Sequence, residues 1–425
     1  MSRKRKLRRA LICVLVVSLI FTGFFSIYYL KRMIPEKLRV VRGEESRISL
    51  QLPISATLTA QSREVTLTDA SNIPAGQVHV LLDDGFSLYS EELGEYALSL
   101  DLFGLFHFRD IQVQVVDTEM VVPCGCPIGI YLETDGILVV GTGQVTGLNG
   151  VTSEPAYGIV HSGDYILAVN QNAVETKEDL IREICASDGE DVLVTLRRAG
   201  EEITVKLPVV QTAAGEYKTG IWVRDDTQGI GTLSYVDMEG RFGALGHGIS
   251  DSDTGQLIED QGGILYDAMI RSVTRGTMGV PGSLAGIINY SDASRLGQIF
   301  DNTDKGIYGQ LSAQARARFD AMECIPVGYR QDIVVGPAVI RCCVDDVVRD
   351  YDIRITRIDL ASHDNKGMVI QVTDPELLAL TGGIVQGMSG SPIIQNGKMV
   401  GAVTHVFVQD STKGYGIFLE NMLEH

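Results

Sequence analysis

The feature that most constrains this chain is an uncharged apolar segment of 21 residues between Ala10 and Leu30, ALICVLVVSLIFTGFFSIYYL. At about 1.5 Å per helical residue, the segment reaches across the roughly 30 Å hydrocarbon core of a bilayer. Six basic residues precede it, a charge distribution that keeps an N-terminus in the cytoplasm. The sequence therefore predicts a basic cytoplasmic segment (1–9) and a transmembrane signal anchor (10–30), with the rest of the chain exported.

A cleaved signal peptide is the alternative for this segment. The apolar region of a signal peptide is usually only about 7–15 residues long and ends at a small-x-small cleavage site. Here the apolar run continues through Tyr28, Tyr29 and Leu30 into Lys31 and Arg32, and no such site closes it. These features favour an uncleaved anchor.

The rest of the chain is acidic. Residues 1–32 contain eight basic and no acidic side chains, so the remaining residues hold 28 of the 36 basic and all 54 acidic ones. The resulting net charge of −26 repels phosphate backbones, which argues against nucleic acid as a partner.

Composition also limits disulfides, metals and cofactors. The seven cysteines are odd in number and irregularly spaced, which argues against a disulfide framework. No CxxC pair, HExxH motif or complete nucleotide-binding motif is present. We expect mostly free thiols, no metal and no cofactor. The cysteines are Cys13, Cys124, Cys126, Cys185, Cys324, Cys342 and Cys343.

The exported part is predicted to be mainly β. Glycine accounts for 46 of 425 residues, about 11 % against a usual 7 %, and short alternating apolar runs are separated by polar turns. We expect a linker (31–45), a small antiparallel β-domain (46–122), a PDZ domain (123–210) and a two-lobed β domain (212–425).

Residues 123–210 resemble a bacterial PDZ domain. The order of strands, the turn SGDYILAVN and one amphipathic helix with Val174, Leu180, Ile181 and Ile184 carry the resemblance. The x-Φ-G-Φ loop of the family is matched by Pro127 followed by Ile128, Gly129 and Ile130. The resemblance implies that the backbone N–H groups of this loop bind the C-terminal carboxylate of a peptide. A purely structural module with an empty groove is the alternative.

A candidate nucleophile lies near the C-terminus, in the run Gly387-Met388-Ser389-Gly390-Ser391-Pro392. A serine between glycines at a sharp turn exposes its hydroxyl, and the N–H groups of Gly387 and Ser389 can converge on one point. Acyl transfer needs such a nucleophile and such an oxyanion hole. The run resembles the nucleophile loop of chymotrypsin-like serine proteases; Ser391 is the alternative nucleophile.

The candidate base is His247, which lies between Gly246 and Gly248 in FGALGHGISD. Such a loop does not suit a packed core residue, and an upstream histidine is what a serine nucleophile requires. The other histidines fit less well: His405 alternates within a strand and is interpreted as core or pocket wall, His161 lies in the PDZ segment, His363 in a polar turn, and His425 is terminal.

Taken together, the anchor, the β-domain, the PDZ segment, GALGHGISD and TGGIVQGMSGSPIIQNGKMVGAVTHVFV resemble the SpoIVB peptidase family of endospore-forming bacteria over essentially the whole chain. The resemblance implies a chymotrypsin-like two-lobed protease with a triad of His247 as base, Asp374 as orienting acid and Ser389 as nucleophile. Asp251, Asp359 and Asp364 remain alternatives for the acid, and Asp374 before PELLAL also fits a helix N-cap.

The resemblance further implies a role in sporulation. The protein would be a membrane-anchored serine endopeptidase in the space between the two forespore membranes, with forms released after self-cleavage. It would cleave itself and the extracytoplasmic part of a membrane-bound regulator of the protease that processes pro-sigma-K. The alternatives are a catalytically inactive PDZ scaffold that binds C-terminal tails, and a housekeeping protease, disfavoured because its PDZ domain usually follows the protease.

Overall fold

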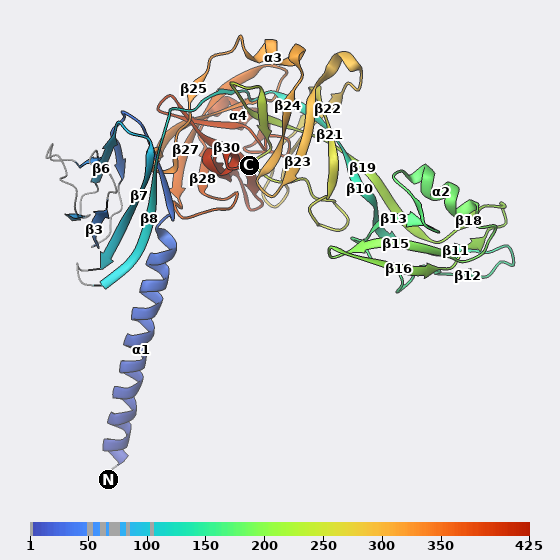
Figure 1. Ribbon diagram of the computed structural model, residues 1–425, viewed down its shortest axis with the longest axis horizontal. Helices are drawn as coiled ribbons and strands as arrows, with labels where there is room; N and C mark the ends of the chain where they lie inside the picture. Colours follow the sequence, from blue (N-terminus) through green and yellow to red (C-terminus); the bar gives the residue numbers. More distant parts are fainter. Residues whose placement is uncertain (1–2, 49–53, 60–64, 68–76, 82–85, 103–105) are drawn as a thin grey trace.

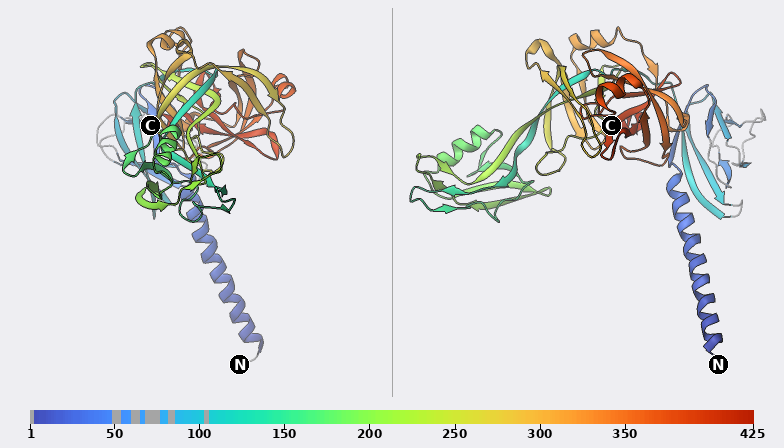
Figure 2. Two further views of the ribbon diagram at one scale, coloured as in Figure 1. Left: turned by 90° about the vertical axis from the view of Figure 1, so that its right-hand side faces the viewer. Right: turned by 180° about the vertical axis from the view of Figure 1, so that it is seen from behind.

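The computed structural model describes residues 3–48, 54–59, 65–67, 77–81, 86–102 and 106–425. Figure 1 shows a central body built of two β-barrels, with an N-terminal β-domain at one end of the long axis and a module containing α2 (Lys177–Cys185) at the other. The view from behind in Figure 2 shows the same order and the helix α1 projecting away from the β-domain. The mainly β fold predicted from the sequence is confirmed.

The apolar N-terminal segment is helical, because α1 spans Arg3–Met33. Among the residues that the structure describes, however, no helix meets the length and apolarity needed to cross a membrane. The predicted transmembrane span at residues 10–30 is therefore not supported.

The described residues of the N-terminal β-domain form a five-stranded and a three-stranded sheet. The strand β1 lies in the predicted linker but pairs in parallel with β8, so the linker region is part of this domain. Other parts of the expected domain, at 49–53, 60–64, 68–76, 82–85 and 103–105, lie outside the described residues. The strands are β1 (Lys37–Val41), β8 (Phe106–Val116), β7 (Gly94–Leu102), β3 (Ile54–Thr59) and β5 (Gln77–Leu81), and β2 (Ser46–Ile48), β6 (Phe86–Ser90) and β4 (Val65–Leu67).

The first barrel of the central body is a ring of six strands. Pairings run from β10 through β21, β23, β24, β20 and β19 and back to β10. Apolar side chains such as Leu233, Phe242 and Ile299 alternate inward and fill it. The strands are β10 (Pro127–Thr142), β19 (Ile221–Asp237), β20 (Arg241–Ala244), β21 (Asp260–Thr274), β23 (Arg295–Thr303) and β24 (Gly306–Leu311), flanked by β9 (Met120–Pro123), β22 (Ser283–Ile288), β25 (Ile325–Pro326), α3 (Ala313–Phe319) and a 3-10 turn (Asp292–Ser294).

The second barrel is closed in the order β26-β27-β28-β31-β30-β29. Its core includes Ile340, Ile353, Ile370 and Ile393, which point inward from four different strands. The structure thus has two lobes, but the first includes β10, which lies outside the predicted range 212–425. The elements are β26 (Gly336–Cys343), β27 (Val348–Ile358), β28 (Met368–Val372), β29 (Pro392–Gln395), β30 (Lys398–Phe407), β31 (Asp410–Phe418), α4 (Pro375–Thr381), α5 (Leu419–Leu423) and a 3-10 turn (Arg330–Asp332).

The PDZ-like module has its own apolar core, which includes Val139, Leu180 and Val194. Helix α2 begins with a capping box formed by Thr176 and Asp179, which satisfies the free N–H groups of its first turn. The module consists of the outer half of β10, β13 (Tyr165–Val169), β15 (Val192–Arg198), β16 (Glu201–Leu207), α2, the first residues of β19, and the short strands β11 (Val145–Thr146), β12 (Thr152–Ser153), β14 (Asn172–Ala173), β17 (Val210–Gln211) and β18 (Tyr217–Lys218).

Two long strands join this module to the first barrel, so the domain boundaries differ from the predicted 123–210 and 212–425. Strand β10 begins in the barrel and ends in the module, whereas β19 begins in the module and ends in the barrel. The predicted carboxylate-binding residues Ile128, Gly129 and Ile130 lie in the barrel half of β10, and that prediction is wrong. They pair with β19 on one side and with β21 on the other, so the sheet already uses this backbone, and both isoleucines are buried.

Candidate active site

A cavity of about 500 Å³ lies at the junction of the two barrels. The first barrel contributes β19 residues and the loop after β20, and the second contributes the loop before β29 and the end of β30. His247, Gly387 and Ser389 all line it, so the structure brings the predicted base, nucleophile and oxyanion-hole residues to one place.

The Ser389 loop is held tightly between the barrels. Its Gly390 N–H donates to Val403 O on β30 at 2.7 Å. A Cβ at Gly390, whose φ is +96°, would lie 2.1 Å from Thr232 O on β19 and 2.6 Å from Leu245 N. A glycine is therefore required next to the nucleophile by both conformation and space.

The two serines of this loop differ in what their hydroxyls do. Ser389 is half-buried, lines the cavity and donates its Oγ–H to Thr404 O at 2.7 Å. Ser391 is fully buried and donates to Met388 O at 2.6 Å within its own loop. Only Ser389 is therefore placed to meet a substrate.

The oxyanion-hole donors of the loop are available. Among the backbone hydrogen bonds of turns and loops in the described part of the chain, none is donated by the N–H of Gly387 or of Ser389. Gly387 adopts a φ of +99°, a conformation that favours glycine. These two N–H groups can serve an anionic oxygen in the cavity.

His247 is held in one tautomer by its own backbone. Its Nδ1 lies 2.8 Å from Gly248 O. A carbonyl oxygen can only accept, so Nδ1 carries the proton and Nε2 keeps its lone pair. Leu245, two residues before His247, has a φ of +69°. This conformation is uncommon for a residue other than glycine, and such residues cluster at functional sites.

Burial keeps this imidazole neutral. The low polarity around His247 lowers its pKa below the usual 6.5, and the Gly248 carbonyl offsets part of that effect. Because a general base must be unprotonated, this shift favours catalysis at neutral pH. Ser389 Oγ–H is bonded to Thr404 O and not to His247, so the hydroxyl has to rotate before proton transfer.

A second histidine lies beside the first. The rings of His405 and His247 are 5.1 Å apart and tilted by 41°, and both line the cavity. Partial burial, together with the nearby His247 and Lys366, lowers the pKa of His405 to about 4. The interpretation of His405 as a pocket wall is therefore confirmed. His161 and His363 are exposed elsewhere, and His425 contacts Asp301 and stacks on Tyr308.

Asp374 does not take the place expected of the orienting acid. It is the N-cap of α4, where Oδ1 accepts from Glu376 N and Leu377 N at 2.9 and 3.0 Å. Oδ2 accepts from Asp352 N at 3.3 Å. The side chain thus satisfies free N–H groups at a helix start, and it does not line the cavity.

The three alternative carboxylates are also engaged elsewhere. Asp251 is buried in an ion pair with Arg224, and Asp359 and Asp364 bond groups of their own turn. Among the described residues that line the cavity there is no Asp or Glu. Sequence analysis therefore missed that Gly248 O holds the tautomer; no motif marks a backbone carbonyl.

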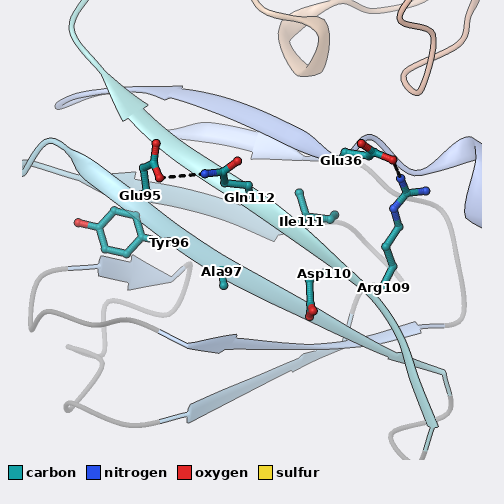
Figure 3. A pocket seen from close by; sticks show the side chains of 8 residues that line it. All are labelled: Glu36, Glu95, Tyr96, Ala97, Arg109, Asp110, Ile111 and Gln112. Carbon is teal, nitrogen blue, oxygen red and sulfur yellow. Dashed lines mark hydrogen bonds and ion pairs between the residues drawn. The ribbon is translucent and has the colours of Figure 1, made fainter.

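A second pocket, of about 510 Å³, lies on the N-terminal β-domain (Figure 3). Four of its polar side chains form two pairs: Gln112 Nε2 donates to Glu95 at 2.9 Å, and Arg109 donates to Glu36 at 2.6 Å. The residues that line it, which include no serine, cysteine or histidine, are Glu36, Glu95, Tyr96, Ala97, Arg109, Asp110, Ile111 and Gln112. Because this pocket contains neither a nucleophile nor a base of the kind found beside Ser389, it is not the candidate active site.

Two β-barrels with a serine and a histidine in one cavity at their junction define a two-barrel peptidase. Residues 215–423 match the family model described as SpoIVB peptidase S55. Residues 215–423 therefore form a domain of the SpoIVB peptidase family, as the sequence resemblance indicated for this part of the chain.

Two solved structures are similar to parts of the chain. The PDZ domain of an SdrC-like protein from Listeria monocytogenes is 21 % identical, with 21 % of this chain and 87 % of that chain covered and a TM-score of 0.18. The Rv3671c protease in its inactive form is 15 % identical, with 46 % and 81 % covered and a TM-score of 0.25. No curated protein matches the chain.

Proposed function

We propose that this protein is a serine endopeptidase in which Ser389 is the nucleophile and His247 the general base. The observation that carries the proposal is that the two side chains line one cavity, with His247 in the neutral tautomer that leaves Nε2 free. The match of residues 215–423 to the SpoIVB peptidase family supports a peptidase.

In the proposed mechanism, the Ser389 hydroxyl leaves Thr404 O and turns toward His247. Nε2 takes the hydroxyl proton while Oγ attacks the scissile carbonyl, and the N–H groups of Gly387 and Ser389 receive the oxyanion. Gly248 O accepts from Nδ1–H of the imidazolium and takes over the orienting role of a triad carboxylate. His247 then returns its proton to the leaving amine, and water releases the acyl group by the same steps.

The PDZ-like module is proposed to bind peptide C-termini at a groove different from the predicted one. Residues 221–226 of β19 pair with β10 along one edge, and among the described strands none pairs with their other edge. Helix α2 lies beside this segment and is fixed to it by Asp225, which accepts from Lys177 N at 2.8 Å. The loop before it, Thr219-Gly220-Ile221, has the glycine at a φ of +73° and would present N–H groups to a carboxylate.

The biological setting is proposed from the family alone. The protein would act in sporulation on itself and on a membrane-bound regulator of the protease that processes pro-sigma-K. The location between the forespore membranes remains a prediction from the sequence.

The test is cleavage by the purified full-length chain of itself and of fluorescently labelled casein. Loss of a triad-type residue lowers the rate by about 10⁴–10⁶-fold, and such losses do not add. Ser389→Ala, His247→Ala and the double variant should therefore be about equally inactive, whereas Ser391→Ala should cleave. Undiminished cleavage by Ser389→Ala would leave the inactive PDZ scaffold as the better explanation.

A further inference from the structure

Thr232, on β19, is bonded to both catalytic loops and is not among the residues that sequence motifs mark. It is 4 % exposed and lies where the first barrel meets the second. Its Oγ1 donates to Gly387 O at 2.8 Å, and its N–H donates to Ser389 O at 3.2 Å. Its carbonyl accepts from Leu245 N at 3.3 Å, two residues before the candidate base.

All three hydrogen-bonding groups of this one residue are thus used to join the loop of Ser389 to the loop of His247. The bond from the hydroxyl matters most because Gly387 has no Cβ and a φ of +99°, so its peptide groups rotate easily unless something outside the loop fixes them. Gly387 lies in the segment that presents the oxyanion-hole N–H groups. Thr232 fixes the carbonyls of Gly387 and Ser389, and these two bonds restrict the segment to one conformation.

Close packing supports the same point independently. Gly390 approaches Thr232 O so closely that an added Cβ would lie 2.1 Å away, and Leu245 Cδ2 lies against the backbone of Gly231, where an added Cβ would be 2.1 Å from it. The loops and this part of β19 therefore form one rigid junction.

We propose that Thr232 is a positioning residue, which sets the geometry of the oxyanion hole relative to His247 through its hydroxyl. The inference rests on the proposed serine-peptidase function. It concerns a residue that touches neither substrate nor the reacting atoms, so its loss should slow the chemical step without weakening ligand binding.

The test uses labelling kinetics of the full chain with a fluorophosphonate. In this reaction Ser389 Oγ displaces fluoride from phosphorus and its proton passes to His247. Thr232→Val keeps the shape of the side chain but removes the hydroxyl. The maximal labelling rate should decrease by at least about 3-fold, the effect expected from the loss of one hydrogen bond. It should decrease by at most about 100-fold, the effect expected when a reacting group is misplaced by about 1 Å. The half-saturating probe concentration should stay within about twofold.

Two matched variants complete the design. Thr232→Ser retains the hydroxyl and should restore most of the rate. Thr134→Val removes the hydroxyl of another buried threonine, which lies 2.5 Å from Gly136 O and 3.0 Å from Asp225 O. Thr134 does not line the cavity, so this variant should label like the wild type. Amide hydrogen exchange of residues 387–391, which requires no catalysis, should increase in Thr232→Val alone.

A Thr232→Val variant with wild-type labelling rate and exchange would overturn the proposal. So would a Thr232→Ser variant as slow as Thr232→Val, because the hydroxyl would then not be the active feature. Failure of the proposed function would look different: Ser389→Ala would still be labelled.

Discussion

At the scale of single residues, the sequence motifs located the reactive groups but not what holds them. Ser389 and His247 were recognisable because glycine-flanked loops expose their side chains, and the structure places both in one cavity. The acid was not predictable in the same way. Asp374 precedes a proline and a helix, and the sequence pattern of an N-cap is the same whether or not the carboxylate also reaches a histidine.

The lowered pKa of His247 leads to a prediction about pH. Neutral His247 is the active base, and burial moves its pKa below 6.5, so the base form persists to lower pH than for a free imidazole. The rate of fluorophosphonate labelling should decrease as the pH falls and should reach half its maximum below about pH 6.5, the midpoint of a free imidazole. A midpoint above about 7 would show that a negative charge stabilises the imidazolium and that a carboxylate does reach His247.

At the scale of elements, most strands and the helix α2 were predictable from the spacing of their apolar residues, whereas strand partners were not. The run at 127–130 reads equally well as a PDZ loop and as a buried strand, because both need apolar residues around a glycine. The run lies in the barrel because it pairs with β21, a strand more than 120 residues later in the chain. Sequence patterns do not indicate such long-range pairing.

The cap at α4 gives a prediction at this scale. Asp374→Asn and Asp374→Ser retain a side-chain acceptor for Glu376 N and Leu377 N, so they should keep both the labelling rate and most of the stability. Asp374→Ala should lower the free energy of unfolding by about 1 kcal/mol, again with little change in rate. Denaturant melts and labelling of the same samples measure both. A loss near 10⁴-fold in Asp374→Asn would instead identify a catalytic triad.

At the scale of the whole molecule, the peptidase and the PDZ-like module share two strands. Length and composition indicated several domains, but they gave no sign that β10 and β19 each run from one unit into the next. The shared strand β19 carries both the proposed peptide groove, at 221–226, and Thr232 at the active site. The proposed peptide groove and the candidate active site therefore share one continuous strand.

The relocation of the peptide groove can be tested with two glycine variants and a pool of synthetic peptides. Gly220→Ala places a Cβ in a left-handed conformation, 2.6 Å from Gly143 O, and should weaken binding of peptides with free C-termini. Gly129→Ala directs a Cβ to within 2.4 Å of Ile288 Cγ2 and should destabilise the barrel by about 1–3 kcal/mol, with unchanged affinity in the folded fraction. Amidated peptides are the control. If folded Gly129→Ala bound peptides more weakly and Gly220→Ala did not, residues 127–130 would be the carboxylate-binding loop after all.

The most direct test of the central claim is to locate the covalent adduct after fluorophosphonate labelling of the full-length protein at pH 7.5. The cavity, the tautomer of His247 and the buried hydroxyl of Ser391 together predict one adduct, on Ser389, as identified by tandem mass spectrometry of the peptide that contains the run GMSGSP. Its formation should be abolished by His247→Ala and unaffected by Ser391→Ala. An adduct on Ser391, or labelling of Ser389 that persists undiminished in His247→Ala, would contradict the account.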